Sequence, residues 1–222
     1  MFKRATVLGA AMVGILALGG AANASVIDFT SASTGHSGSI LGGAVTWTMT
    51  ASGYLNNSQA FDGNTAPVVP GMSFQTDGYG VGLHDDEITT TAKKQEWIQV
   101  AFSKPTLINA IYFLDLFVAK NLRTWEVGQA SVNGGSTIFD VVATDVITSS
   151  TKNRPAGFAS TVFKPIYASV IRFTVLSSND NYGFADGALA GIGIAPIPVP
   201  AAGALLLGGL GGLAVLRRRK KA

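Results

Sequence analysis

Apolar and polar residues alternate with a period of two in many segments of the middle of the chain. In residues 98–102, Ile98, Val100 and Phe102 fall on one face, with polar or small residues between them. Successive side chains of a β-strand point to opposite faces, so this pattern predicts strands with one buried face. The other segments of this kind are residues 45–50, 106–117, 124–132, 136–143, 158–163, 169–176 and 188–194.

Turn residues separate these predicted strands. Asn133-Gly134-Gly135 lies between two of them and predicts a β-hairpin. Lys104-Pro105 and Lys164-Pro165 are each expected to end one strand just before the next begins. Many short strands with turns between them are typical of an antiparallel β-sandwich. We therefore predict an all-β body with a jelly-roll-like sandwich.

One long segment does not follow the alternating pattern. Residues 51–91 are polar and rich in glycine, and they contain Pro67 and Pro70. Loops of this length are usually functional or disordered, or they contain short strands. We expect a binding function to lie here first.

The first 24 residues have the order of a secretory signal peptide. Lys3 and Arg4 precede an apolar stretch over residues 5–18, and Ala22 and Ala24 follow with the small side chains of a cleavage site. Cleavage is expected between Ala24 and Ser25. The body would then be exported, and its lack of cysteine fits a protein that needs no disulfide bonds.

The end of the chain has the features of a short membrane span. Residues 201–216 carry no charge and would extend about 24 Å as a helix, less than the roughly 30 Å of a hydrocarbon core. A basic cluster, predicted to stop transfer on the cytoplasmic side, follows at once: Arg217, Arg218, Arg219, Lys220 and Lys221. The predicted organisation is a signal helix over 1–24, a β-sandwich over 25–195 and a tail with a transmembrane helix over 196–222.

The charges of the chain are separated between the ends and the middle. Seven of the sixteen basic residues belong to the two terminal segments, whereas all thirteen acidic residues lie between Asp28 and Asp186. The middle therefore has nine basic and thirteen acidic groups. A body with an acidic excess does not suit nucleic-acid binding, which requires a basic face to neutralise phosphates.

The densest polar cluster is residues 78–88, with Asp77 just before it. Carboxylates and the carbonyls of a glycine-rich backbone are the oxygen ligands that Ca²⁺ prefers. An acidic loop in water is the alternative interpretation, and Ca²⁺ is the candidate cofactor. The candidate ligands are Asp77, Asp85, Asp86, Glu87 and Asp180. They could share one ion only if the loop around Asp180 lies next to this acidic cluster.

Other candidate chemistry is sparse. Trp47, Trp97 and Trp125 are either core residues or a platform on which sugars stack. His36 and His84 are the only histidines, too few for a typical zinc site, and no G-x-S-x-G nucleophile motif occurs. A carboxylate pair for glycoside hydrolysis depends on spatial separation and stays open. We assign no catalytic residue and expect that the protein is not an enzyme.

The tail resembles the PEP-CTERM class of bacterial sorting signals. Ile197-Pro198-Val199-Pro200-Ala201 is similar to the VPLPA variant of its motif, and the glycine- and leucine-rich span and arginine-rich end follow in the same order. The resemblance implies processing by an exosortase, a membrane enzyme that would be the partner of this protein. It also implies an inner-membrane intermediate and a final place in the cell envelope, on the surface or outside the cell.

Two functional hypotheses follow. The first is a non-enzymatic structural or adhesive protein of the exopolysaccharide or biofilm matrix, sorted through its tail. The alternative is a β-sandwich module that binds or cleaves a glycan and has a Ca²⁺-supported loop. Binding to a glycan array, with loss on substitution of tryptophan, would favour the alternative.

Overall fold

The computed structural model of the protein describes residues 25–120, 123–148, 154–176 and 184–196. The predicted signal peptide, Asp180, the sorting motif and the basic tail lie outside these ranges, so their predictions remain predictions. No helix within the described ranges has the length and apolar character needed to cross a membrane.

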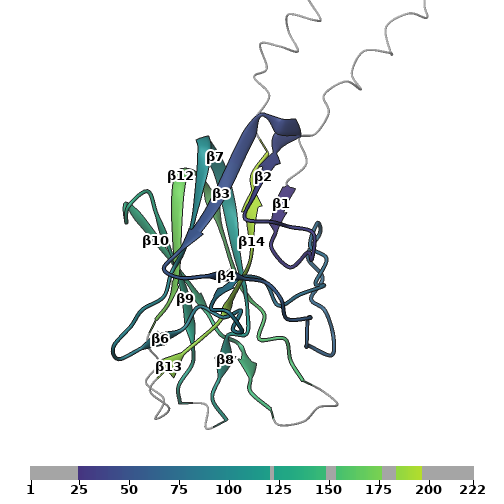
Figure 1. Cartoon of the computed structure of the whole chain (residues 1–222), viewed down its shortest axis with the longest axis vertical. Coiled ribbons are helices and arrows are strands. Elements are labelled where there is room, and N and C mark those ends of the chain that lie inside the picture. The colour runs from purple at the N-terminus through teal and green to yellow at the C-terminus, as the bar shows by residue number, and fades with distance from the viewer. Residues whose placement is uncertain (1–24, 121–122, 149–153, 177–183, 197–222) are drawn as a thin grey trace, which may run out of the picture. The chain divides into compact units, whose positions relative to one another are not determined.

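The described residues form an all-β, mainly antiparallel fold, as the alternating pattern predicted (Figure 1). One short 3₁₀ helix, η1, covers Leu41–Gly43. The strands are β1 (Ser25–Asp28), β2 (Ser37–Ile40), β3 (Val45–Ala51), β4 (Leu55–Asn56), β5 (Gly80–Val81), β6 (Thr90–Thr91), β7 (Ile98–Leu114), β8 (Phe117–Val118), β9 (Val127–Val132), β10 (Thr137–Val142), β11 (Asp145–Val146), β12 (Ala159–Val175), β13 (Phe184–Ala185) and β14 (Ala188–Ile194).

The main sheet has the strand order β1-β14-β7-β12-β9-β10, and β3 joins it by pairing with both β7 and β2. Strand β7 changes partner along its length. Its first part, Ile98–Phe102, pairs with β3, and its last part, from Ile108 to Leu114, pairs with β14. Strand β12 pairs with both parts of β7 and also with β9. The two long strands therefore belong to both halves of the fold.

The prediction that Lys104-Pro105 and Lys164-Pro165 end strands is wrong, because β7 and β12 each continue through their proline. The register between the two strands shifts between Val162 and Ile166, and again between Ala168 and Val170. Both prolines lie in the resulting bulges. A bulged residue donates no ladder hydrogen bond, so proline's missing N–H is tolerated there.

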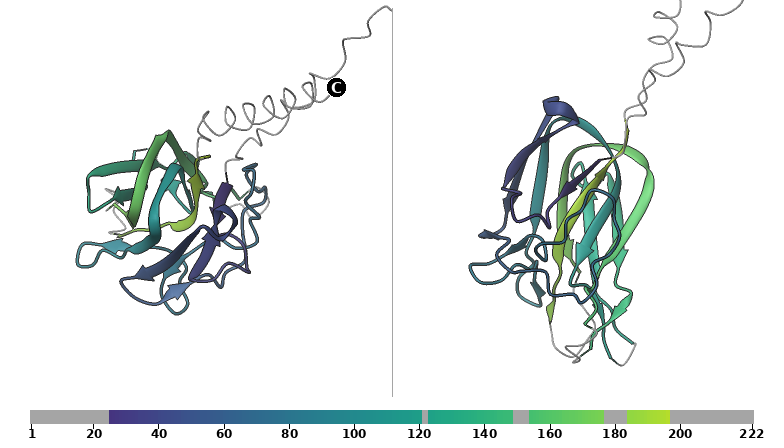
Figure 2. Two further views of the ribbon diagram at one scale, coloured as in Figure 1. Left: turned by 90° about the horizontal axis from the view of Figure 1, so that it is seen from above. Right: turned by 90° about the vertical axis from the view of Figure 1, so that its right-hand side faces the viewer.

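The bulges allow the long strands to curve, and the light-green ribbon of β12 shows this curvature in the right view of Figure 2. The two halves of the sheet face each other across one large apolar core, consistent with the predicted sandwich. The inward residues of the alternating segments supply it, including Ile98, Val100, Ile171 and Phe173, all fully buried. Phe113 packs edge-on against Phe173, with ring centroids 6.2 Å apart.

Part of the long polar segment covers the outside of this sheet. Phe74 belongs to a second apolar cluster with Leu114, Ala188 and Ala190, and Phe61 packs against that cluster. Every residue of β14 is buried as a result. Residues 61–74 of the segment, which was expected to bind a ligand, therefore have a structural role.

The predicted hairpin at Asn133-Gly134-Gly135 is confirmed. All three residues have positive φ, and Thr137 pairs with Val132 across the turn. The Asn133 side chain also ties the turn to β12, because its Oδ1 accepts hydrogen bonds from the backbone N–H of Ser169 and Val170.

The glycines of residues 78–82 are explained by close packing of the backbone. A Cβ on Gly80 would lie 1.8 Å from the backbone carbonyl carbon of Asp86, and a Cβ on Gly78 would lie 2.6 Å from the carbonyl oxygen of Leu189. Only glycine fits where two backbones approach so closely. This packing fixes Asp86 and Glu87 directly over β5.

Candidate functional site

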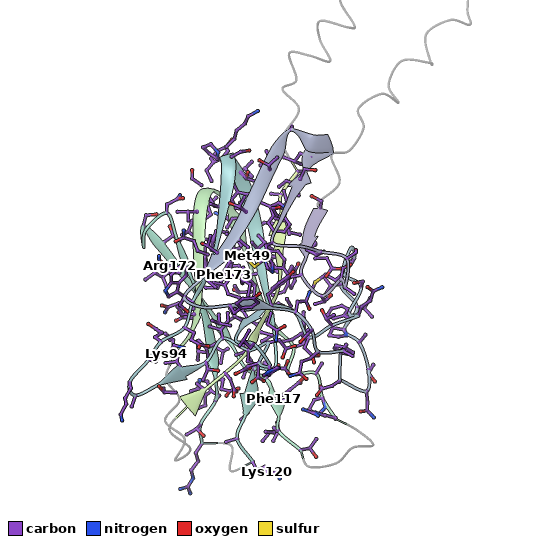
Figure 3. The ribbon with its side chains drawn as sticks, viewed as in Figure 1. Met49, Lys94, Phe117, Lys120, Arg172 and Phe173 are labelled. Atoms are coloured by element: carbon purple, nitrogen blue, oxygen red, sulfur yellow. The ribbon has the colours of Figure 1, made fainter. Side chains whose placement is uncertain are left out.

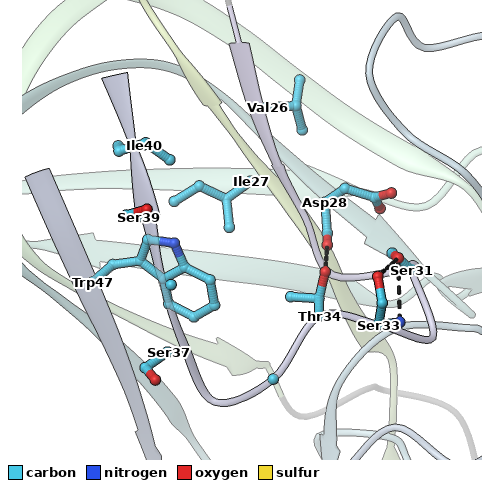
Figure 4. A pocket seen from close by; sticks show the side chains of 12 residues that line it. Val26, Ile27, Asp28, Ser31, Ser33, Thr34, Ser37, Ser39, Ile40 and Trp47 are labelled. Atoms are coloured by element: carbon cyan, nitrogen blue, oxygen red, sulfur yellow. Dashed lines mark hydrogen bonds between the residues drawn. The ribbon is translucent and has the colours of Figure 1, made fainter. Parts of the chain in front are cut away.

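A groove of about 400 Å³ lies between β1 and β2 (Figure 4). Among the described strands, β1 pairs with β14 and β2 pairs with β3, so both strands present an unpaired backbone edge. Five of the twelve lining residues carry a hydroxyl group, the most frequent polar group of the lining. The lining consists of Val26, Ile27, Asp28, Ser31, Ser33, Thr34, Gly35, Ser37, Gly38, Ser39, Ile40 and Trp47.

Asp28 is the one charged residue of this lining, and hydrogen bonds within the protein occupy its carboxylate. Thr30 donates to Oδ1 through both its backbone N–H and its hydroxyl, at 2.9 and 2.6 Å. The backbone N–H of Ser73 donates to Oδ2 at 2.9 Å. The Thr34 hydroxyl donates to the backbone carbonyl of Asp28 at 2.7 Å and closes the loop (Figure 4). The carboxylate thus shapes the loop, and its hydrogen-bonding capacity is largely used within the protein.

Trp47 lies at the base of the groove, packed beneath β2. It is 4% exposed, and its ring packs edge-on against Phe29 at 5.4 Å between centroids. Gly38 lies opposite it in the register, where a Cβ would be 2.8 Å from the indole ring. Glycine at this position therefore allows the indole to lie flat against the β2 backbone, with only its margin available to a ligand.

The three tryptophans do not come together as a single platform. Trp47 is a core residue, whereas Trp97 is half-buried beneath the guanidinium of Arg172, 4.4 Å from its ring. Trp125 is 51% exposed and pairs with Val118 near β8. The core interpretation holds for Trp47, and the other two lie at separate places.

Several carboxylates lie close enough to raise one another's pKa values, among the loops around β5 and at the end of β7. Of the predicted calcium ligands, Asp77 and Asp86 are buried there, with 7% and 4% of their surfaces exposed. Glu87 is half-buried beside them, Asp85 is exposed, and Asp180 lies outside the described residues.

The structure adds four carboxylates to this cluster: Asp62, Asp115, Glu126 and Asp186. The backbone N–H of Asp62 donates to Oδ1 of Asp77 at 3.2 Å, and Arg154 forms an ion pair with Asp62 at 2.7 Å. Asp115 is buried at the end of β7 with φ of 57°. An acidic residue within the apolar sequence of residues 111–117 was the one signal that could have identified it.

Burial raises the pKa of most of these carboxyl groups, and the nearby acidic residues raise it further. The pKa of Asp77 is raised to about 7 and that of Glu87 to about 8. That of Asp115 is raised to about 9, mainly by burial and then by the charge of Asp77. Desolvation and like charge both favour the neutral acid. Near neutral pH, the surroundings therefore favour the protonated, uncharged form of these buried carboxyl groups.

The carboxyl groups of Glu126 and Asp186 are hydrogen-bonded to each other at one side of the cluster. Burial first, and then this hydrogen bond, raise the pKa of Glu126 to about 9. Backbone N–H groups of Phe117 and Asp186 donate to Glu126 at 2.8 and 3.3 Å. Carboxyl groups in direct hydrogen bond are closer than the roughly 5–10 Å used in glycoside hydrolysis, so this pair does not match that geometry.

Some buried oxygens of this region have no hydrogen-bond partner. In the carboxylate cluster they are Oδ2 of Asp86 and Oδ1 of Asp62. Leaving such an oxygen unpaired is costly, so a water molecule or a cation is expected beside it. Within the described ranges, no three His, Asp or Glu side chains are placed to share one ion. Neutral oxygens would have to complete any cation site.

The substitution Asp115→Asn tests the electrostatic account of the cluster. Asp115 ionises near pH 4 in the unfolded chain but near pH 9 in the folded protein, so it lowers the stability progressively as the pH rises from 4 to 9. Asparagine has the same shape, tolerates positive φ and cannot ionise. We expect Asp115→Asn to match the wild type near pH 4 and to be more stable by about 1–3 kcal/mol near pH 8.

Denaturant unfolding of the full-length chain in EDTA, at several values of pH, measures this difference. The exposed Asp140, on β10, provides the control Asp140→Asn, for which we expect no pH-dependent gain. A constant difference between Asp115→Asn and the wild type at every pH would contradict the account.

No protein-family model matches the chain, and no curated protein matches it. Solved structures similar to it include a pectin-binding carbohydrate-binding module (15% identity, 51% of this chain and 75% of that chain, TM-score 0.29). Another is chitosan-binding module 1 of a Paenibacillus sp. IK-5 chitosanase/glucanase (12% identity, 67% of this chain and 93% of that chain, TM-score 0.31). A third is a Clostridium perfringens chain in complex with GalNAc-β-1,3-galactose (13% identity, 65% of this chain and 94% of that chain, TM-score 0.30). At these TM-scores, a function has to be argued from the residues themselves.

Proposed function

We propose that the body is a non-catalytic, glycan-binding β-sandwich module of an exported protein, with a jelly-roll-like arrangement of its strands. The observation that carries this proposal is the hydroxyl-lined groove between β1 and β2. The second of the two hypotheses from the sequence was a β-sandwich module that binds or cleaves a glycan, and we propose its binding version. A structural role in a polysaccharide matrix would follow from it.

The chemistry of the groove suits a neutral sugar. A hydroxyl group both donates and accepts hydrogen bonds, as sugar hydroxyls do, so Ser31, Ser37 and Ser39 can match a ligand of that kind. The unpaired backbone edges of β1 and β2 add further donors and acceptors. No lysine or arginine lines the groove, so a phosphate or another anion would find no counter-charge there.

The groove is tested with the double variant Ser37→Ala/Ser39→Ala of the full-length chain. Each lost hydrogen bond to a ligand costs about 0.5–1.5 kcal/mol, so we expect about a tenfold weaker binding to the neutral glycans that the wild type selects on an array. Titration of the selected glycan by calorimetry measures the change.

The matched control is Thr46→Ala/Thr48→Ala. These residues pair directly with Ser39 and Ser37 in the register but lie on β3, outside the groove lining. Equal loss of binding in both double variants, or no binding of any neutral glycan by the wild type, would refute the assignment of the groove.

For the carboxylate cluster, we propose a Ca²⁺ ion that supports the loop end. The buried, unpartnered Oδ2 of Asp86 supports this, together with the unpartnered Oδ1 of Asp62. A cation there would stabilise the ionised form of these carboxyl groups, which burial and then like charge disfavour. Backbone carbonyls or water would complete its six to eight ligands. Asp85, being exposed, has the weakest claim among the ligands predicted from the sequence.

Thermal unfolding of the full-length chain with Ca²⁺ or with EDTA tests this ion. A ligand that binds only the folded state raises the melting temperature, here by about 3–5 °C at saturating Ca²⁺. We expect Asp140→Asn to keep this increase and Asp86→Asn to lose it. Calorimetry that detects no heat on addition of Ca²⁺ to the wild type would rule the ion out.

For the tail, we propose sorting by an exosortase, as its resemblance to PEP-CTERM signals implies. The motif Ile197–Ala201 followed by an uncharged span and basic residues supports this proposal. Mass spectrometry of the surface form should then find a C-terminus that lacks Arg217–Lys221. A surface form that still ends at Ala222 would contradict it.

A further inference from the structure

The outward face of the sheet carries a row of polar side chains across four strands. In the register, Thr50 of β3 pairs with Gln99 of β7, Gln99 pairs with Arg172 of β12, and Arg172 pairs with Ser131 of β9. Their neighbours along each strand, such as Phe173, point into the core. In Figure 3, Arg172 lies at the margin of the body and Phe173 nearer to its centre.

The guanidinium of Arg172 is held in place on this face. Its carbon lies 4.4 Å from the centroid of the Trp97 ring, and its Nη2 donates a hydrogen bond to Oε1 of Gln99 at 3.1 Å. Stacking on an indole leaves the N–H edges of a guanidinium free to bind in their own plane. Arg172 is therefore oriented before any ligand arrives.

The charge of Arg172 is not neutralised within the described residues. Arg154 pairs with Asp62 and Lys94 pairs with Glu96, but no carboxylate of the described chain lies within ion-pair distance of Arg172. Asp140 lies on the same face, where its carboxylate accepts a hydrogen bond from Gln129 at 2.9 Å. An oriented and uncompensated guanidinium is complementary to a carboxylate, which it can bind through two parallel hydrogen bonds.

We propose that this row, which we name the Arg172 row (Thr50, Gln99, Arg172 and Ser131), docks an acidic polysaccharide by binding a uronate carboxylate at Arg172. The inference rests on the proposed glycan-binding function but uses a surface separate from the groove. Hydroxyl and amide side chains beside the arginine suit the neighbouring sugar hydroxyls.

Affinity electrophoresis of the full-length chain through gels that contain alginate, a polymer of uronic acids, tests this proposal. We expect retardation of the wild type by alginate, at least fivefold weaker affinity for Arg172→Gln and an intermediate affinity for Arg172→Lys, which keeps the charge but not the paired hydrogen bonds. Because the contact is electrostatic and exposed, we also expect the affinity to fall as salt is added.

The matched control is Lys164→Gln, which removes one exposed positive charge from the same strand outside the row. It should bind alginate as the wild type does. Equal weakening by Lys164→Gln and Arg172→Gln would overturn the inference, and so would equal retardation of the wild type by alginate and by carboxyl-reduced alginate.

The groove and the row fail separately. Loss of neutral-glycan binding in Ser37→Ala/Ser39→Ala with alginate binding intact supports two sites. A chain that binds neutral glycans through the groove but is not retarded by alginate refutes the Arg172 row and leaves the proposed function in place. A chain retarded only by alginate refutes the groove and supports the row.

Discussion

The pairing of β7 with β12 is the constraint on which the rest of the structure depends. These two 17-residue strands remain hydrogen-bonded along most of their length, yet they curve at bulges that contain Pro105 and Pro165. One ladder therefore supplies a central pair to both halves of the fold. The inward residues of both halves then meet in a single core, to which Phe113 and Phe173 contribute from these strands.

The candidate sites lie where this ladder leaves strands without a partner or brings loops together. The groove forms because β1 and β2 are edge strands of the two halves and face each other without pairing. The carboxylate cluster forms beyond the end of β7, where Asp115 follows the last paired residue. The Arg172 row forms where β3, β7, β12 and β9 lie side by side in register and turn polar side chains outward.

Local patterns were sufficient for part of this architecture. The alternation over residues 98–102 and the turn at Asn133 act between near neighbours, so the sequence predicted both correctly. The continuation of β7 through Pro105 depends on its partner strand β12, which is distant in sequence. At the bulge, β12 requires no hydrogen bond from the backbone nitrogen of residue 105, so proline is tolerated. The burial of Trp47 depends in the same way on Gly38 across the ladder. Likewise, Asp62 and Glu126 carry no local signal that they lie beside Asp77 and Asp186.

The adjacency of the first and last strands has a mechanical consequence. Ser25 pairs with Ile194 in the register, and β14 lies between β1 and β7. Ladder hydrogen bonds of antiparallel strands run perpendicular to the strand axis. Suppose that the chain is pulled beyond Ile194 while the opposite end of the body, where the carboxylate cluster lies, is held. The force then acts along the axis of β14. It therefore shears the bonds to both neighbours together instead of opening them one at a time, and the buried glycine- and alanine-rich strand is the element that bears the load.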